Sequence, residues 1–438
     1  MGAGLETARS VQEPLQAALV EAILPYCGRP GRRPQRGPSR RPVAAAGTAD
    51  GADGAGADGA DGTAVPPLNQ RQWLGIGRDV LALHEGYTQR RGAFAHEANP
   101  IHARLPAYQL YYLPRNWYRV HRVLQQLPWA HARQAAVPEA WLEPTGATAL
   151  LRLLDLGCGS GAFSLAWLGW LAGRRGADAP PLTVRLTLVD QGRQLLELAQ
   201  ANLRAYARRV LPGVTLHCDV HADGVEAFLA GRAGAAPYAV AGAAMALNEL
   251  DLLGPRRVSQ RAAALADALQ ARLRPGGCLL LVEPGTRKGY MNLMALREHL
   301  LELPALYPCP HNRPCPMWGG TVRNWCHATE RLPPGFFFDA TLRQRAGLSF
   351  EMRDLQLAAL AVQALPGTQA APPFRPRRGE RIVSAPLRPR GPQGATPDTG
   401  ARVVLACAPD GRLHERPAPP GGVYTRGEWS GPAHEGAL

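Results

Sequence analysis

The chain has 438 residues, 46% of them hydrophobic and only 19% charged, which excludes a wholly disordered polymer and predicts two or three domains. Its formal net charge of +14 favours a polyanionic partner, with a basic surface that binds nothing as the alternative. The longest apolar run, residues 162–172, is too short for a bilayer, so we expect no membrane contact.

The first 67 residues divide into a helix and a linker. Residues 1–28 hold one amphipathic helix, clearest over residues 11–27. Residues 29–67 are an Arg/Pro run followed by a Gly-Ala-Asp repeat, which cannot bury enough apolar surface to order itself, so we expect a disordered linker. Acidic residues interrupt the N-terminal apolar stretch, which argues against a targeting segment. We therefore expect the bacterial cytoplasm first, and the mitochondrial matrix if the host is eukaryotic.

Residues 68–145 have helical periodicity and form a predicted helical domain, with a break or kink at Pro114. Tyrosines and tryptophans alternate with arginines over residues 108–122. Such a pattern has two interpretations. The rings and guanidinium groups stack bases and hold phosphates of RNA, or they pack against the next domain.

Residues 146–365 alternate strand and helix patterns, which predicts a parallel α/β sheet covered on both faces. The predicted strands are ALLRLLDLG, TVRLTLVD, VTLHCD, YAVAGAAMAL and GCLLLVEP. After this domain we expect C-terminal strands within residues 366–426, including ARVVLAC, and a frayed tail over residues 427–438.

A glycine-rich loop follows the first strand of this domain, in LLDLGCGSGAF. Glycines there let the backbone turn tightly and approach a nucleotide without side-chain clashes. An acidic residue at the end of the second strand is placed to accept hydroxyls of a ribose. The predicted cofactor-binding residues are Asp155, Gly157, Gly159, Gly161, Asp190, Asp219 and Asn248.

The D-x-G-x-G-x-G run resembles the first motif of class I methyltransferases, which bind S-adenosylmethionine; a dinucleotide-binding fold is the alternative. Asp219 is assigned either to the adenine amino group or to a helix cap. After the fourth strand, Asn248 and Glu249 stand where nucleic-acid amino-methyltransferases carry a base-gripping Asn/Asp-Pro-Pro-aromatic loop, which this chain lacks. No catalytic base is evident. The sequence therefore predicts a methyltransferase fold and leaves open whether the chain transfers a methyl group.

A cysteine-rich loop over residues 304–332 is predicted to bind metal. It places Cys309, Cys315 and Cys326 within 18 residues punctuated by proline and glycine, and Cys407 is available as a fourth thiol. Thiolates on an irregular loop can converge on a soft metal. Four thiolates suit zinc as well as an iron–sulfur cluster, and the residues alone favour zinc.

Other side chains near these motifs have two interpretations each. His311 and His327 either replace a thiol or, as we expect, donate hydrogen bonds to the ligands. The turn that begins at Glu283 either meets a ligand or simply ends the fifth strand. Trp318 and Trp325 either stack on RNA or, as we expect, shield the metal site from water.

Several segments together resemble the small-ribosomal-subunit (Rsm-type) methyltransferase-like family of mitochondria and bacteria. They are AYQLYYLPRNWYRV, LLDLGCGSGAF, ALNELDLL, LLLVEPGTRKGYMNLMALREHLL, PCPHNRPCP, NWCHATERL and LACAPDGRL, across residues 105–415. The cysteine-containing segments are the specific ones. The chain departs from the family at residues 319–321, which look inserted.

The resemblance implies a class I S-adenosylmethionine-dependent methyltransferase (Rossmann-like) fold with an N-terminal helical domain. It also implies a 4Fe-4S cluster held by Cys309, Cys315, Cys326 and Cys407, and binding to small-subunit rRNA during ribosome assembly or translation. Two alternatives stay open: a catalytically active rRNA methyltransferase, and a zinc-stabilised methyltransferase of a non-RNA substrate.

Overall fold

The computed structural model describes residues 2–27, 65–88, 101–130, 137–145, 148–176, 179–231, 236–250, 252–253, 260–318, 325–350, 352–365, 380–383, 402–418 and 429–430. Nearly all of the predicted linker, the insertion at residues 319–321 and most of the predicted tail lie outside these ranges.

The chain divides into two compact units. One comprises Met1–Tyr112 and Gly335–Glu351, and the other comprises Leu113–Pro334 and Met352–Leu438. The predicted domain bounds, including the one at residues 145/146, stay a prediction.

The first unit is helical. Helices α1 (Gly2–Cys27) and α2 (Gln70–Thr88) both contact the short α4 (Leu105–Ala107), and α2 packs on α11 (Asp339–Ala346). Gly77 makes the α2–α11 packing possible, because a Cβ at that position would lie 2.0 Å from the Ala346 carbonyl oxygen. Among the described helices of the chain, none has both the length and the apolarity needed to cross a bilayer.

The predicted break at Pro114 takes the form of a π turn. Tyr108–Tyr112 forms this wider turn, and α5 (Leu113–Leu124) begins directly after it, with Pro114 in its first turn. Proline has no N–H to donate and its ring crowds the carbonyl one turn back, so the backbone opens before it. The helical pattern is therefore confirmed on both sides of the proline.

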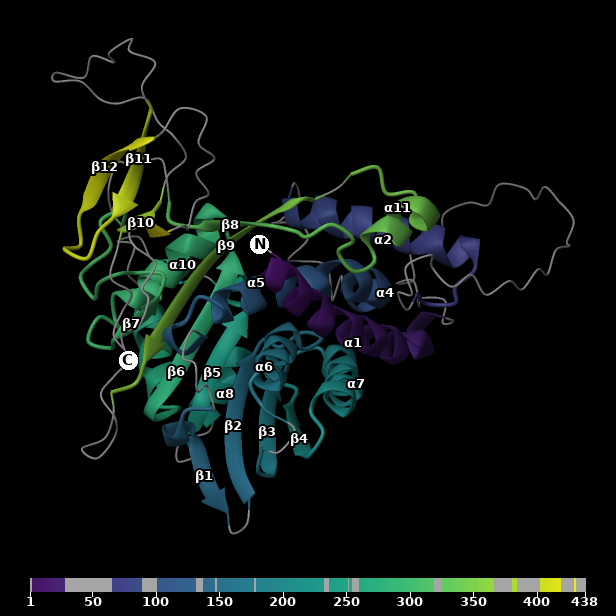
Figure 1. Ribbon diagram of the computed structural model, residues 1–438, viewed down its shortest axis with the longest axis horizontal. Coiled ribbons are helices and arrows are strands. Elements are labelled where there is room, and N and C mark those ends of the chain that lie inside the picture. The colour runs from purple at the N-terminus through teal and green to yellow at the C-terminus, as the bar shows by residue number, and fades with distance from the viewer. Residues whose placement is uncertain are drawn as a thin grey trace, which may run out of the picture. The chain divides into compact units, whose positions relative to one another are not determined.

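The second unit contains the α/β sheet that the sequence predicts (Figure 1). Its parallel strands run in the order β4-β3-β2-β5-β6. Next to β6 lies β9, which pairs with it in antiparallel fashion, and β7 pairs antiparallel with the other edge of β9. Two further strands pair at its margins, β1 with β2 and β8 with β9. The bounds are β1 Leu142–Thr145, β2 Thr148–Leu156, β3 Leu182–Val189, β4 Val214–His221, β5 Tyr238–Ala244, β6 Leu273–Pro284, β7 Ala305–Tyr307, β8 Ala328–Arg331 and β9 Asp354–Gln363.

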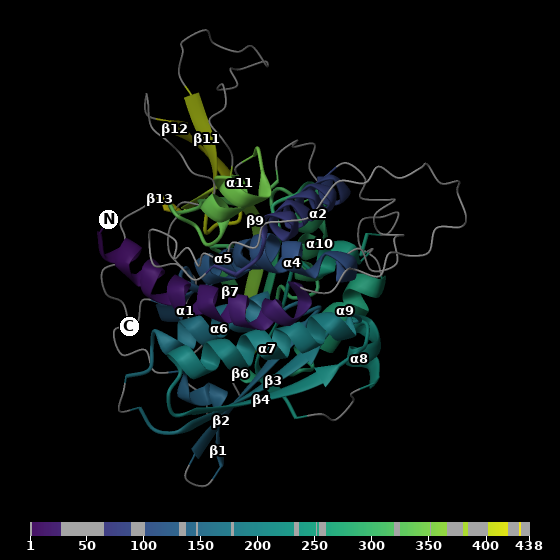
Figure 2. The ribbon, with the colours of Figure 1, turned by 90° about the vertical axis from the view of Figure 1, so that its right-hand side faces the viewer.

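The described helices of this unit form two groups, each packed within itself. The first group is α5, α6 (Ala162–Ala172) and α7 (Arg193–Val210), of which the last two lie side by side in Figure 2. The second is α8 (Val225–Gly231), α9 (Gln260–Gln270) and α10 (Arg287–Arg297). The strand order reverses between β2 and β5, which is where open α/β sheets bind ligands.

A second, smaller sheet follows in the order β12-β11-β10-β13. It pairs β10 (Glu380–Ile382) with β11 (Arg402–Cys407) and with β13 (Trp429–Ser430), and β11 with β12 (Leu413–Ala418). The predicted strand ARVVLAC is thus confirmed as β11. Two residues expected in the frayed tail instead form β13.

Candidate functional site

The glycine loop lies at the carboxyl end of β2, beside the reversal of strand order. Gly157, Gly159 and Gly161 all have positive φ, at 62°, 52° and 97°. At Gly157 a Cβ would also come within 2.4 Å of the Ala246 Cβ, so a side chain there would close the gap between this loop and the loop after β5. The three predicted glycines therefore have backbone conformations that favour glycine, and at Gly157 the neighbouring loop leaves no room for a side chain.

Asp190, directly after β3, tethers this loop through its side chain. One carboxylate oxygen accepts the Gly159 N–H at 2.9 Å, and the other accepts the Gly192 N–H at 2.8 Å. The structure thus brings Asp190 to the glycine loop, and its predicted contact with a ribose stays a prediction.

Asp155 is buried beneath the same loop, with 1% of its surface exposed. Its Oδ2 accepts hydrogen bonds from the Ser164 hydroxyl at 2.7 Å and from the Ser164 N–H at 3.2 Å. Burial raises the pKa of Asp155 to about 7, against the lowering effect of the Ser164 hydrogen bonds. In this structure the carboxyl group holds the first turn of α6 in place. The sequence analysis did not single out Ser164.

The loop after β5 is held by a second buried carboxylate, Glu283 near the end of β6. Its two oxygens accept the Leu247 N–H at 2.8 Å and the Asn248 N–H at 3.0 Å. Burial raises the pKa of Glu283 to about 7. Asn248 closes the loop by donating from Nδ2 to the Met245 carbonyl at 2.7 Å. Glu283 therefore acts on the loop that abuts Gly157, a role that neither sequence interpretation of its turn anticipated.

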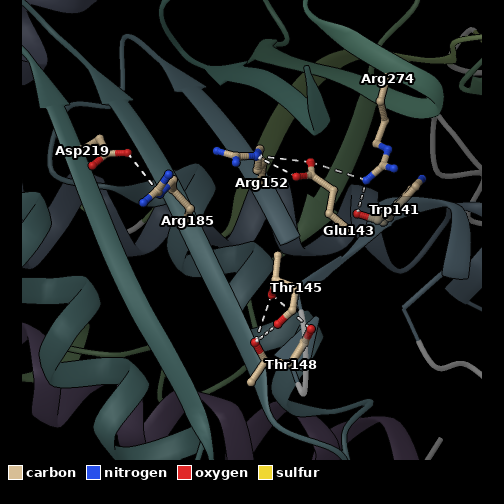
Figure 3. A network of polar contacts seen from close by, with 8 residues as sticks. All are labelled: Trp141, Glu143, Thr145, Thr148, Arg152, Arg185, Asp219 and Arg274. Atoms are coloured by element: carbon tan, nitrogen blue, oxygen red, sulfur yellow. Dashed lines mark hydrogen bonds and ion pairs between the residues drawn. The ribbon is translucent and has the colours of Figure 1, made fainter. Parts of the chain in front are cut away.

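Asp219, on β4, points toward Arg185 of the neighbouring strand β3 (Figure 3). The expectation that it closes the third strand is wrong, because β4 continues to His221. Its side chain is half exposed, and its Oδ2 lies 3.6 Å from the Nε of Arg185 on the neighbouring strand. A few strands away, Glu143 lies between Arg152 and Arg274. The cofactor role of Asp219 stays a prediction.

The four predicted cysteine ligands line one cavity in the second unit. Cys309, Cys315 and Cys326 come from the cysteine-rich loop, and Cys407 is the last residue of β11. The cavity measures about 440 Å³ including its opening to solvent, and apart from Arg381 its other lining residues are mainly apolar. Among the described residues, no group of three or more His, Cys, Asp or Glu side chains is arranged to hold a metal ion.

Two polar side chains, His311 and Tyr290, contact the thiols. His311 Nε2 lies 3.3 Å from Cys407 Sγ, while His311 Nδ1 accepts the Arg313 N–H at 3.1 Å. Because Nδ1 accepts, the neutral ring carries its proton on Nε2 and donates it to the sulfur. Tyr290 Oη, from α10, lies 3.5 Å from Cys315 Sγ. The expectation that His311 serves as a donor to a ligand thus agrees with its position.

Burial is the main influence on the pKa of three of the cysteine thiols that line this cavity. It raises the pKa of Cys326 to about 12 and raises those of Cys315 and Cys407 as well. Trp318 and Trp325 are partly buried against the hydrophobic core of the second unit, which includes Cys315 and Cys407. The indole N–H of Trp325 donates to the Gly285 carbonyl at 2.8 Å. This packing agrees with the shielding interpretation of the two tryptophans.

The arginines on α5 bond to the sheet. Arg119 Nε donates to the Gln356 carbonyl at 3.1 Å, and Arg122 Nε forms an ion pair with Glu330 at 2.8 Å. Tyr118 Oη donates to the Arg331 carbonyl at 3.1 Å. Packing, the second interpretation of the aromatic and arginine pattern, therefore accounts for these three residues.

Comparison with known proteins gives one family match, which covers part of the chain. Residues 249–344 match the family model described as "Mitochondrial small ribosomal subunit Rsm22". No curated protein matches the chain.

Among solved structures, the N-methyltransferase NodS from Bradyrhizobium japonicum, in complex with S-adenosyl-L-homocysteine, is 12% identical. The match covers 65% of this chain and 98% of NodS, with a TM-score of 0.31. A class I S-adenosylmethionine-dependent methyltransferase from Listeria monocytogenes is 14% identical over 70% of this chain and 83% of its own, with a TM-score of 0.29. The strand order of the larger sheet is that of a class I methyltransferase-like fold, and the match over residues 249–344 confirms the resemblance to the Rsm-type methyltransferase-like family.

Proposed function

We propose that this chain is a methyltransferase-like protein of the small ribosomal subunit that binds S-adenosylmethionine, a 4Fe-4S cluster and small-subunit rRNA. It acts in assembly of the subunit or in translation. The observation that carries the proposal is the meeting of four cysteines, one of them more than 80 positions beyond the other three, at a single cavity.

The glycine loop fits S-adenosylmethionine because its backbone is bare where a side chain would block it. The residues that would hold the cofactor are Gly157, Gly159, Gly161, Asp190 and Asn248, with Asp155 supporting the loop from below. When bound, the cofactor supplies an electrophilic methyl group. Glu283 and Asn248 hold the loop after β5 in place beside the glycine loop.

The cysteine cavity fits a thiolate-bound cluster by its donor set. Its four sulfurs are soft ligands, and most of the residues around them are apolar. Cys309, Cys315, Cys326 and Cys407 would hold the cluster, and His311 would donate to the Cys407 sulfur. A cluster bound there would link the cysteine-rich loop to the smaller sheet.

An rRNA partner agrees with the net charge of +14 and with the ribosomal description of the matched family. That description is mitochondrial, so it favours the matrix over the bacterial cytoplasm expected first.

The test is anaerobic purification followed by an absorption spectrum and by iron, sulfide and zinc analysis. The expected result is a brown protein with iron and sulfide in equal amounts. A colourless protein with zinc would instead support the zinc-stabilised alternative.

Two further measurements address the other ligands. Calorimetric titration with S-adenosylmethionine should show binding, and affinity for small-subunit rRNA should fall steeply with salt. Transfer of a labelled methyl group to that rRNA would establish the catalytically active alternative.

A further inference from the structure

Arg381 borders the cysteine cavity from the smaller sheet. It lies in β10 directly opposite Cys407 of β11 in the antiparallel register, so the two side chains share one face of the sheet. Only 2% of its surface is exposed, and it lines the cavity together with the four thiols. A permanently charged side chain is therefore buried beside the proposed cluster.

The contacts of Arg381 hold its guanidinium group toward the sulfurs. Its Nη2 donates to the Tyr307 hydroxyl at 2.8 Å, and its Cζ lies 4.5 Å from the centre of that ring. Cys326 and Cys309 both lie close enough to Arg381 to interact with it electrostatically.

A cation out of contact with water costs several kcal/mol unless an anion opposes it. Thiols are neutral when protonated, but a centre held by four thiolates is an anion. The thiolates would therefore supply the negative charge that this buried guanidinium group requires.

We propose that Arg381 compensates the charge of the cysteine-bound centre and sets its reduction potential, an inference that rests on the proposed cluster. On reduction the cluster takes one electron from a low-potential reductant, no cysteine bond breaks, and its charge becomes more negative. A nearby cation stabilises that reduced form more than the oxidised form, so it raises the potential.

Arg297 provides a contrast within the same region. It is also buried, but its Nη2 donates to the His311 and Arg313 carbonyls, at 3.1 and 2.7 Å. These contacts fix the backbone between Cys309 and Cys315. Arg297 therefore supports the loop, and it also acts electrostatically on Cys315 and Cys407. Arg381 instead acts on Cys326 and Cys309 and donates to the Tyr307 hydroxyl.

The test is a redox titration of the anaerobically purified protein with dithionite, followed by absorption and electron paramagnetic resonance. Arg381→Gln removes the cation, and Arg381→Lys keeps it. Arg416→Gln, on the exposed side of β12 in the same sheet, is the matched control for loss of one charge. Iron and sulfide are measured for every variant.

The expected result is a more negative potential in Arg381→Gln, with Arg381→Lys close to the unmodified protein and Arg416→Gln unchanged. Loss of iron in Arg381→Gln with retention in Arg381→Lys would also support the proposal. An unchanged potential in Arg381→Gln, a shift of equal size in Arg381→Lys, or equal loss of iron from both variants would overturn it. An unmodified protein without iron and sulfide would refute the proposed cluster itself, which is a separate outcome.

Discussion

The glycine loop and the cysteine cavity of the second unit are built in opposite ways. The loop joins β2 to α6 within one short stretch of chain, and its main tether, Asp190, directly follows the adjacent strand β3. The cavity instead needs Cys407, which reaches it only because β11 pairs with β10 in a separate sheet. The loop thus depends on local backbone geometry, whereas the cavity depends on long-range packing.

The largest expected effect breaks the cavity from its distant side. Cys407→Ser should abolish binding of iron and sulfide, because it removes the one ligand contributed by the smaller sheet. Metal analysis checks this result. Cys218→Ser is the control, since Cys218 lies in β4 and should leave the metal content unchanged. Full retention of iron in Cys407→Ser would contradict the four-cysteine site.

A pH dependence should distinguish the carboxyl group beneath the loop. The folded-state pKa of Asp155 is about 7, raised from 3.8, so its contribution to stability is full below pH ~4 and is lost as the pH rises through 7. Asp155→Asn should flatten the fall in the free energy of unfolding over this window by up to about 4 kcal/mol.

Urea denaturation at pH 4 to 8 measures this difference between Asp155→Asn and the unmodified protein. If the free energy of unfolding falls equally with pH in the two proteins, the pKa of Asp155 is not raised in the folded state, which would contradict the prediction. The near-identical shape of asparagine keeps an oxygen available for the Ser164 hydrogen bonds.

The loop can also be broken locally. Gly157→Ala should destabilise the protein by about 1–3 kcal/mol and weaken binding of S-adenosylmethionine, because φ is 62° and the new Cβ would meet Ala246. Gly213→Ala is matched in backbone, with φ at 76°, but its Cβ would meet nothing within 4 Å. It should cost about 1 kcal/mol and leave affinity unchanged. Calorimetry and thermal unfolding separate the two effects, and equal losses of affinity would refute the specific role of Gly157.

The smallest effect concerns the arginines on α5. Arg122→Ala should cost only about 0.5–1 kcal/mol, because its ion pair with Glu330 is partly exposed to solvent. If packing is its whole role, the salt dependence of rRNA binding should be unchanged. A shallower salt slope in this variant would instead return Arg122 to the RNA-binding interpretation.

Local patterns predicted much of the second unit. The five parallel strands, the glycine loop and the strand that carries Cys407 follow from apolar runs and glycine spacing, which act over a few residues. Asp219 was misplaced because a pattern does not show where a strand ends, and β4 runs two residues further. The sequence did not predict that Glu283 holds the loop after β5 or that Arg381 lines the cysteine cavity. Whether a charged residue is buried depends on the neighbours that the fold brings to it, and no local pattern shows them.

By itself, the sequence determined the class of sheet, the bare backbone of the glycine loop and the supply of four thiols. These depend on residue type and on spacing along a few turns of chain. Only the tertiary structure decided that Glu283 holds the loop after β5, that Arg122 bonds to Glu330, and that Arg381 faces the cysteines. Each of these contacts joins residues from separate elements, and the pairing of strands and helices, not their local sequence, sets which side chains meet.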